Sequence, residues 1–201
     1  MSGRPEFAEL LAPHCGGEVR DRLVRYAELL ERWSERHNLV RFCDRRELVE
    51  RHLAEALAAV NMLGETGELL DIGSGAGLPG VPLLVARPRW SGVLLEPRQK
   101  RWAFLRLVIR ELQLDARVER ARYQEVAAGR SWDLITARAV GDYDELLGWA
   151  RTRLSAEGAL IVWTTEGKEG ELREQPGWRM LSSALPGLDR GRLARLQPCF
   201  T

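Results

Sequence analysis

The stretch Leu69-Leu-Asp-Ile-Gly-Ser-Gly-Ala-Gly-Leu-Pro-Gly80 decides the fold of this chain. It begins as a short apolar run, which is typical of a buried strand, and continues as a loop that contains four glycines. Glycines let a backbone turn tightly and approach a ligand closely. Residues 81–86 are then expected to form a helix, with prolines near its first turn, where a missing N–H costs little. A strand, a glycine-rich loop and a helix in this order predict a ligand site at the carboxyl end of the strand.

Outward from this stretch, short apolar runs alternate with helical segments. We expect strands at residues 69–72, 93–95, 116–121, 133–137, 159–163, 178–185 and 192–196. Helices are expected at residues 81–86, 98–113 and 142–154. This alternation predicts an α/β fold of Rossmann-like type, in which a mostly parallel sheet carries helices on both faces and the crossovers are right-handed.

The first sixty-odd residues are predicted to be helical. Apolar residues recur at spacings of four and three along one helix face, at Val19, Leu23, Tyr26, Leu30 and Trp33. Asn38 suits the end of this helix, because asparagine tolerates the left-handed conformation. Asp44 with Glu47 forms a capping box for the next helix. We therefore predict an N-terminal helical extension, residues 1–66, packed on a ligand-binding domain, residues 67–201.

The composition is that of a globular protein, with 45% hydrophobic and 29% charged residues among 201. These values exclude a disordered chain and a collagen-like fibre. No uncharged apolar stretch reaches the roughly 18 residues of a membrane span, and residues 1–10 do not resemble a signal peptide. The three cysteines lie far apart and are expected to be free thiols, which favours the cytoplasm. The three histidines show no zinc-ligand spacing, so no metal site is expected.

The glycine spacing fits two ligand classes, a dinucleotide fingerprint at Gly75, Gly77 and Gly80 and the S-adenosylmethionine loop at Asp71, Gly73, Gly75 and Gly77. Asp71 favours the second class, because its carboxylate attracts a cationic methyl donor and repels a pyrophosphate. Pro79 favours it as well, because proline has no N–H to offer a phosphate at the helix N-terminus. Glu96 ends the second strand and suits the ribose hydroxyls of either ligand. The loop therefore predicts a methyl donor, with a dinucleotide as the alternative.

The charge distribution points to a further binding feature. The net charge is only +1, but residues 87–122 hold ten basic and four acidic residues, net +6. A positive band of this kind can track phosphates. Arg98, Lys100 and Arg101 open a helix, where cations oppose the helix dipole, and this local cost suggests phosphate contact. We predict these three as substrate-binding residues; a solvated helix face is the alternative.

Residues 33–192 resemble the glucose-inhibited division protein B family. Its members are bacterial methyltransferases that modify N7 of a guanosine in small-subunit ribosomal RNA. The similar segments are Asn38-Leu39-Val40 with Asp44, Glu50-Arg51-His52-Leu53, the glycine-rich loop from Asp71 to Gly80, Lys100-Arg101 with Phe104-Leu105, and Ala137-Arg138-Ala139. The Leu-Pro-Gly ending of the loop is more specific than its glycines alone.

This resemblance implies a class I S-adenosylmethionine-dependent methyltransferase fold and a ribosomal RNA methyltransferase in the cytoplasm. Its partner would be ribosomal RNA or the small ribosomal subunit, and the enzyme would be a monomer without a metal or a membrane. The family's donor-contacting positions correspond to Gly73, Leu78, Tyr123, Gln124 and Arg138. The complete candidate cofactor site is Asp71, Gly73, Gly75, Gly77, Leu78, Glu96, Tyr123, Gln124 and Arg138. Arg138 is also the candidate catalytic residue, and we expect its side chain to be exposed at the carboxyl end of the sheet.

The expected chemistry is simple, because guanine N7 has a free lone pair and no proton to lose. Its methylation therefore needs no general base. Two positions depart from the family pattern: Thr164-Thr165 stands where the family has Lys-Gly, and Leu193 follows Arg192 where the family has His. These departures leave two alternatives open. One is a diverged methyltransferase acting on another RNA or a small molecule, and the other is a non-catalytic S-adenosylmethionine-binding regulator.

Overall fold

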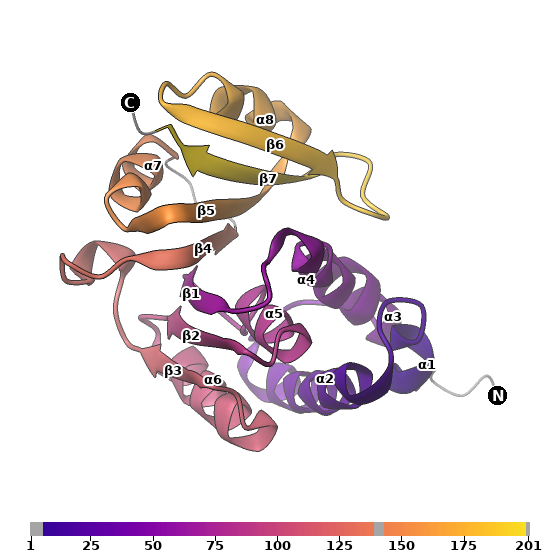
Figure 1. Cartoon of the computed structure of the whole chain (residues 1–201). Coiled ribbons are helices and arrows are strands. Elements are labelled where there is room, and N and C mark those ends of the chain that lie inside the picture. The colour runs from indigo at the N-terminus through magenta and orange to yellow at the C-terminus, as the bar shows by residue number, and fades with distance from the viewer. Residues whose placement is uncertain (1–5, 139–142, 200–201) are drawn as a thin grey trace.

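Seven strands form one mixed sheet in the computed structural model, which describes residues 6–138 and 143–199. Their order is β3-β2-β1-β4-β5-β7-β6 (Figure 1). The strands are β1 (Gly67–Ile72), β2 (Trp90–Leu95), β3 (Ala116–Glu119), β4 (Trp132–Arg138), β5 (Leu154–Thr165), β6 (Trp178–Ala184) and β7 (Gly191–Pro198). β1 to β5 run parallel to one another, whereas β7 is antiparallel to β5 and to β6. The predicted α/β fold with a mostly parallel sheet is confirmed.

Helices precede the sheet and fill its crossovers. Before β1 lie α1 (Phe7–Leu11), α2 (Gly17–His37), α3 (Arg45–Leu48), η1 (Val49–Leu53), α4 (Ala54–Leu57) and η2 (Val60–Met62). Between the strands lie α5 (Gly80–Ala86), α6 (Gln99–Leu112), η3 (Tyr123–Glu125), α7 (Tyr143–Arg151) and α8 (Glu166–Arg173). The predicted helical character of the N-terminal residues is confirmed.

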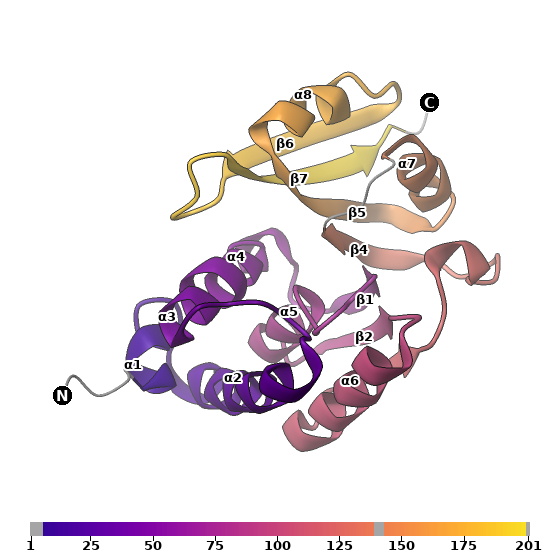
Figure 2. The same ribbon diagram turned by 180° about the vertical axis from the view of Figure 1, so that it is seen from behind.

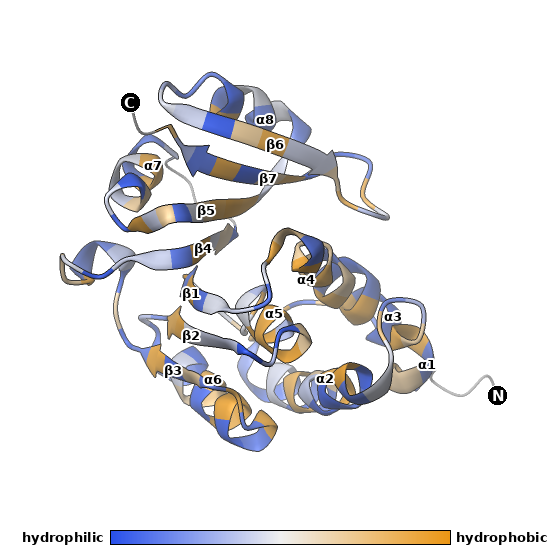
Figure 3. Cartoon of the chain, in the orientation of Figure 1, coloured by the Kyte–Doolittle hydropathy of each residue, from blue (hydrophilic) through white to orange (hydrophobic). Residues whose placement is uncertain are grey.

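Each face of the sheet packs against its own set of helices. In β1, Leu69 belongs to the core on the first face and Leu70 to the core on the second. The helices before β1, with α5 and α6, cover the first face, and α7 and α8 cover the second (Figures 1 and 2). Fully burying one leucine contributes about 2 kcal/mol. Figure 3 shows hydrophilic and hydrophobic residues side by side along α2 and α6, the pattern of helices with one buried face.

The strand register brings the carboxyl ends of four strands to one edge of the sheet. Ile72 of β1 is paired with Leu95 of β2 and with Ala137 of β4. Arg138, the next residue of β4, is paired with Trp163 of β5. The chain therefore leaves β1, β2 and β4 at adjacent positions, and this edge is where open parallel sheets bind their ligands.

Local signals in the N-terminal sequence are borne out with one shift. Asn38 ends α2 in the left-handed conformation, with φ 49°. The Asp44 carboxylate accepts a hydrogen bond from the Glu47 N–H at 2.8 Å, as a capping residue does. The Glu47 carboxylate accepts from the N–H of Cys43, one residue earlier than the predicted capping box requires.

Two elements differ from the sequence-based prediction. The helix expected at residues 142–154 ends at Arg151, and Leu154 already begins β5. Asp142, like Ala139 of the Ala-Arg-Ala motif, lies outside the described residues. α8 was not expected. Leu172 is its only buried residue, so the segment carries no apolar periodicity that could announce a helix.

Candidate active site

The glycine-rich loop follows β1, and three of its glycines have positive φ angles. Gly73, Gly75 and Gly77 have φ values of 65°, 60° and 98°, a region that side chains other than glycine rarely adopt. A Cβ at Gly73 would have no neighbouring atom within 4 Å. A Cβ at Gly77 would lie 2.7 Å from Val81 and 3.0 Å from the Tyr26 hydroxyl. Gly73 therefore faces open space, whereas Gly77 is required for packing within the protein.

Asp71 supports this loop from within the core. Its side chain is fully buried; Oδ1 accepts a hydrogen bond from the Thr136 hydroxyl at 2.7 Å, and Oδ2 accepts from the Gly80 N–H at 3.2 Å. Burial raises the pKa of the Asp71 carboxyl to about 6, although these hydrogen bonds act in the opposite direction. The sequence suggested a carboxylate open to the methyl donor. The structure instead encloses it between β4 and α5, so Asp71 is a support of the loop.

Glu96 joins the loop to the start of α6. Its buried carboxylate accepts hydrogen bonds from the N–H of Gly75 at 3.0 Å and from the N–H of Arg98 at 2.7 Å. Leu78, another predicted donor contact, is also buried, and its N–H donates to the carbonyl of Ser74 at 3.1 Å. The peptide bond from Leu78 to Pro79 is cis.

The N-terminal helices contact the loop directly. The hydroxyl of Tyr26, a fully buried residue of α2, donates to the carbonyl of Ala76 at 2.7 Å. From α6, Arg101 donates to the carbonyl of Leu39 at 3.4 Å and lies 3.8 Å from the Cβ position of Gly75. The loop is therefore held between α2 and α6, and sequence reasoning did not assign Tyr26 this role.

Tyr123 and Gln124 lie in η3, and both contact α7. The Tyr123 ring packs edge-on against Trp149, with ring centroids 5.2 Å apart. The Gln124 amide donates to the carboxylate of Glu145 at 2.9 Å. Both predicted contact residues are therefore positioned by α7.

Arg138 lies next to the loop but is only partly exposed, contrary to the expectation of an exposed side chain. Its Nη2 donates to Oε2 of the buried Glu55 at 2.9 Å and lies 3.4 Å from Nδ1 of His52. Its Nη1 is buried and makes no hydrogen bond with any residue that the structure describes. Burial raises the pKa of Glu55, while Arg138 opposes the rise. Burial and then Arg138 lower the pKa of His52.

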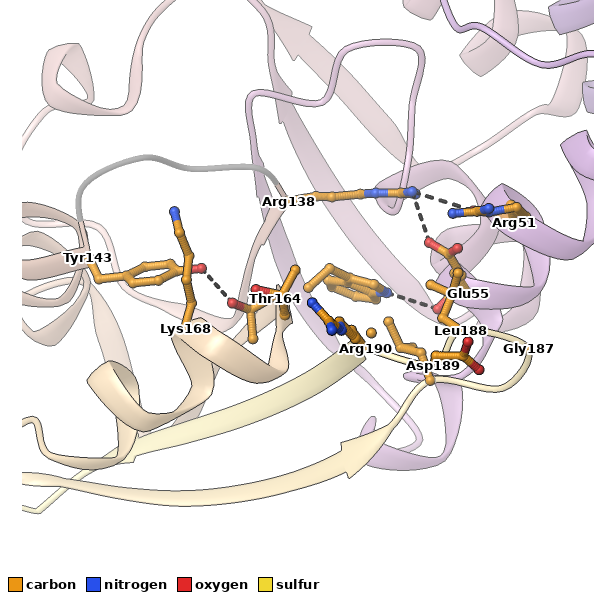
Figure 4. A pocket seen from close by; sticks show the side chains of 14 residues that line it. Arg51, Glu55, Arg138, Tyr143, Thr164, Lys168, Gly187, Leu188, Asp189 and Arg190 are labelled. Atoms are coloured by element: carbon orange, nitrogen blue, oxygen red, sulfur yellow. Dashed lines mark hydrogen bonds and ion pairs between the residues drawn. The ribbon is translucent and has the colours of Figure 1, made fainter.

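A pocket of about 840 Å³ opens beside Arg138, at the carboxyl ends of β4 and β5 (Figure 4). Its lining includes charged and polar side chains from four parts of the chain, which are Arg51, Glu55, Arg138, Tyr143, Thr164, Thr165, Lys168, Asp189 and Arg190. The hydroxyls of Tyr143 and Thr164 are 2.7 Å apart, and the Trp163 indole donates to the Glu55 carbonyl at 2.9 Å. Sequence reasoning found only Arg138 in this pocket.

One signal could have located the pocket, namely the polar pair Thr164-Thr165 directly after the apolar residues of β5. Residues at the carboxyl end of a buried strand are candidates for a site. The loop 187–191 joins β6 to β7 and reaches the pocket from a distant part of the chain. No local sequence pattern predicts that these residues contact the pocket.

The predicted substrate cations lie elsewhere. Arg98 is the N-cap of α6, and Lys100 and Arg101 are in its first turn. Arg98 and Lys100 are exposed, whereas Arg101 is half-buried against the loop. None of the three lines the pocket. The structure thus separates a basic helix start on one side of the glycine-rich loop from a cationic pocket on the other.

Comparison with known proteins settles the family. The model of a family described as rRNA small subunit methyltransferase G matches residues 20–185. The chain belongs to this family. It is 40% identical over 159 residues to ribosomal RNA small subunit methyltransferase G of Thermobifida fusca, covering 79% of this chain and 67% of the relative. It is 36% identical over 175 residues to the protein of that name from Xanthomonas campestris, covering 85% and 82%.

Solved structures agree on the fold. A methyltransferase from Geobacter sulfurreducens superposes with a TM-score of 0.65 at 13% identity, covering 86% of this chain and 90% of that one. TYW2 from M. jannaschii in complex with AdoMet superposes with a TM-score of 0.59 at 14% identity, covering 73% and 76%. The Rossmann-like class I methyltransferase fold expected from the sequence is confirmed.

As a member of the rRNA small subunit methyltransferase G family, the chain is an S-adenosylmethionine-dependent rRNA methyltransferase. The resemblance seen in the motifs is confirmed, and neither the dinucleotide enzyme nor the non-catalytic regulator has support from these matches. The backbone at Gly73 faces open space that no side chain occupies, and this space suits a donor that approaches the backbone closely. Within residues 6–138 and 143–199, no helix is long and apolar enough to cross a membrane and no metal-binding cluster of side chains occurs. The three cysteines are free.

Proposed function

We propose that this methyltransferase places its donor in the crevice beyond β1 and β2, and the target guanosine of the small-subunit RNA in the pocket beside Arg138. The observation that carries this proposal is the register of β1 and β4. Ile72 is paired with Ala137, so Gly73 and Arg138 leave the sheet side by side. Open space at Gly73 and a pocket of about 840 Å³ at Arg138 are therefore neighbours.

The proposed donor site uses the residues suggested by the sequence, with roles refined by their contacts. Gly73 and Gly75 give the donor access to the backbone. We propose that Glu96, whose carboxylate accepts a hydrogen bond from the N–H of Gly75, binds the ribose hydroxyls, and that Tyr123 with Gln124 forms the adenine side of the site. Asp71, Gly77 and Leu78 shape the loop from within the core.

Arg138 is proposed to touch the reactants on both sides. Its buried Nη1 has no hydrogen-bond partner among residues 6–138 and 143–199, and we propose that it turns to a carboxylate or phosphate of a bound ligand. A guanidinium held by one carboxylate can still bind a second anion, because it carries five N–H donors in a fixed plane. Glu55 therefore orients the residue, and the free edge of Arg138 serves the ligand.

The proposed reaction transfers the methyl group to guanine N7 by in-line displacement. When bound, S-adenosylmethionine supplies an electrophilic methyl group on its sulfonium. The protein aligns the base with that group, and such alignment can contribute roughly 7–11 kcal/mol. Guanine N7 carries no proton, so none of the pocket residues has to act as a general base. The reaction therefore requires no proton transfer to Tyr143 or Thr164, whose hydroxyls form a hydrogen bond with each other.

Three further parts of the proposal concern the whole protein. Residues 1–66 act as a helical extension that shapes residues 67–201, supported by the contacts of Tyr26 and Glu55 with the site. One chain holds both the donor crevice and the pocket, which supports a monomeric enzyme. A ribosomal RNA substrate supports action in the cytoplasm, and attack by N7 requires no metal ion.

A methyl-transfer assay tests this proposal. The protein is incubated with tritiated S-adenosylmethionine and either protein-free small-subunit RNA or intact small subunits, and the modified base is identified by mass spectrometry. We expect 7-methylguanosine. Label in another base would overturn the assignment of N7, and binding of the donor without transfer to either substrate would overturn the proposed reaction.

A further inference from the structure

The end of α2 and the start of α6 form a surface that the proposed active site does not use. The two helices are antiparallel neighbours. Arg22 donates to the carbonyl of Leu112 at 2.6 Å at one end, and the rings of Trp33 and Phe104 lie 5.4 Å apart towards the other. Because α6 begins at the carboxyl edge of the sheet, the last turns of α2 lie near the same edge as the glycine-rich loop (Figures 1 and 2).

Two hollows on this surface share Trp33. One, of about 370 Å³, is lined by Trp33, Trp102, Ala103, Arg106, Leu107 and Arg110. The other, of about 340 Å³, is lined by Leu29, Arg32, Trp33, Glu35, Arg36 and His37. We call the residues of the two hollows together the α2–α6 groove. It combines partly exposed indoles with exposed guanidinium groups.

The charge of the α2–α6 groove is strongly positive. Arg32, Arg36 and Arg106 are exposed, and none of them forms an ion pair with a described residue. In contrast, Arg25 and Arg45 on neighbouring surfaces are both paired with glutamates. Glu35 is the acid among the lining residues, and no acid lines the hollow that contains Trp102. Unpaired cations on one surface attract a polyanion.

The aromatic residues of the groove add a second recognition element. The Arg106 guanidinium lies over the Trp102 ring, 4.8 Å from its centroid. Indoles flanked by arginines suit unpaired nucleotides, because a base can stack on the ring while its phosphate meets the cation. A double helix would offer only its phosphates to such a hollow, since its bases are already stacked on one another.

We propose that the α2–α6 groove binds a single-stranded segment of the substrate RNA outside the target nucleotide. A base enters the hollow between Trp33 and Trp102, and phosphates meet Arg36 and Arg106. This inference rests on the proposed RNA methyltransferase activity and names a docking site remote from the pocket. The exposed cations Arg98 and Lys100 stand at the start of α6, before the groove residues of that helix, and would extend the phosphate contacts towards the glycine-rich loop.

Charge reversal tests the phosphate contacts. Arg36→Glu and Arg106→Glu are compared with Arg179→Glu, an equal charge change at an exposed arginine of β6 on the far edge of the sheet. Binding of protein-free small-subunit RNA is measured across a salt series. We expect each groove variant to bind at least about tenfold more weakly and its log–log salt slope to fall by about 0.7 per lost contact. The Arg179→Glu variant should stay close to wild type.

Trp102→Leu tests the stacking contact separately. It keeps apolar bulk on α6 but removes the ring, so we expect RNA affinity to fall about tenfold with an unchanged salt slope. Calorimetry should give the wild-type affinity for S-adenosylmethionine in all groove variants, and methyl transfer at saturating RNA should persist with a raised KM. Thermal melting checks that each variant is folded; if Trp102→Leu is not, the two arginine variants decide.

Different outcomes separate this inference from the activity on which it rests. If the wild-type protein methylates RNA but both arginine variants behave like Arg179→Glu, the groove is not an RNA site. If those variants lose affinity for S-adenosylmethionine as well, the groove acts through the donor loop and the docking assignment is overturned. A wild-type protein that methylates no ribosomal RNA overturns the proposed function first.

Discussion

The carboxylate of Glu55 lies 2.9 Å from the guanidinium of Arg138, so a buried acid from the N-terminal helices orients a cation at the end of β4. The two residues are 83 positions apart in the sequence. Arg138 lines the pocket and stands beside the proposed donor crevice. Because Glu55 belongs to α4, the orientation of Arg138 depends on the position of that helix. This contact makes the N-terminal helices part of the active site.

Breaking the Glu55–Arg138 pair should affect both stability and turnover. Arg138→Ala leaves a buried carboxylate without its counterion, which costs about 3 kcal/mol in the free energy of unfolding. Methyl transfer should fall at least about tenfold, equivalent to roughly 1.4 kcal/mol in transition-state free energy. Arg138→Lys should recover part of the rate, because an ammonium cannot reproduce two-point contact. Thermal melting and initial rates are measured on the same proteins.

A double variant separates the two effects of Arg138. In the Arg138→Ala background, Glu55→Gln removes the unpaired charge, so the melting temperature should rise again while methyl transfer stays low. If the double variant regains activity together with stability, Arg138 is a structural residue and does not contact the reactants.

Alanine at Gly73 should act mainly on donor binding, whereas alanine at Gly77 should act mainly on stability. Both positions have positive φ, so both variants lose about 1–2 kcal/mol from backbone strain. At Gly73 the methyl group projects into open space and should reduce S-adenosylmethionine affinity at least about tenfold. At Gly77 it overlaps Val81, which should cost a further ~1–3 kcal/mol of stability. Calorimetry and melting on both variants check this; wild-type donor affinity in Gly73→Ala would move the donor elsewhere.

The Asp71 carboxyl should make stability fall with rising pH. An aspartate in the unfolded chain titrates near 3.8, and in the folded protein burial raises this pKa to about 6. Between these values the folded state holds a proton that the unfolded state has released, so the free energy of unfolding falls as pH rises through that window. Relative to Asp71→Asn, the wild type should lose on the order of 3 kcal/mol from pH 4 to pH 7. Urea titrations at both pH values measure it, and a pH-independent difference would contradict the assignment.

Lys168 should contribute to RNA binding from the pocket side. It is exposed at the pocket, and its ammonium lies 5.5 Å from the ring centroid of Tyr143. Lys168→Ala removes a cation from the proposed nucleotide site, so the KM for RNA should rise several-fold with unchanged donor affinity. Arg179→Ala serves as the control of equal charge. Equal KM values for the two variants would place the nucleotide outside this pocket.

Sequence reasoning predicted the elements that have strong local patterns. The apolar run of β1, the glycines after it and the periodic face of α2 all depend on neighbours within a few residues, and all are confirmed. The roles of Asp71 and Arg138 depend on partners far along the chain. Thr136 encloses the first and Glu55 holds the second, and no local pattern reveals a contact across 65 or 83 positions.

The same limit explains why the pocket was missed. Its wall includes residues of the loop 187–191, which becomes a neighbour of β5 only through the antiparallel pairing of β7. α8 was not predicted because a helix with one buried residue has no apolar periodicity in its sequence.

The hydrogen bond from Tyr26 to Ala76 also bears on the order in which the protein is made. During synthesis α1 and α2 emerge first and can pack on each other, but the Tyr26 hydroxyl has no partner until Ala76 appears 50 residues later. The contact of Arg22 with Leu112 requires 36 more residues, because Leu112 follows Ala76 by that number. At roughly 5–20 residues per second, the nascent helix waits several seconds before Tyr26 and Arg22 meet these partners. The part of α2 that holds the glycine-rich loop therefore stays uncovered after the part that packs on α1 has found its partner.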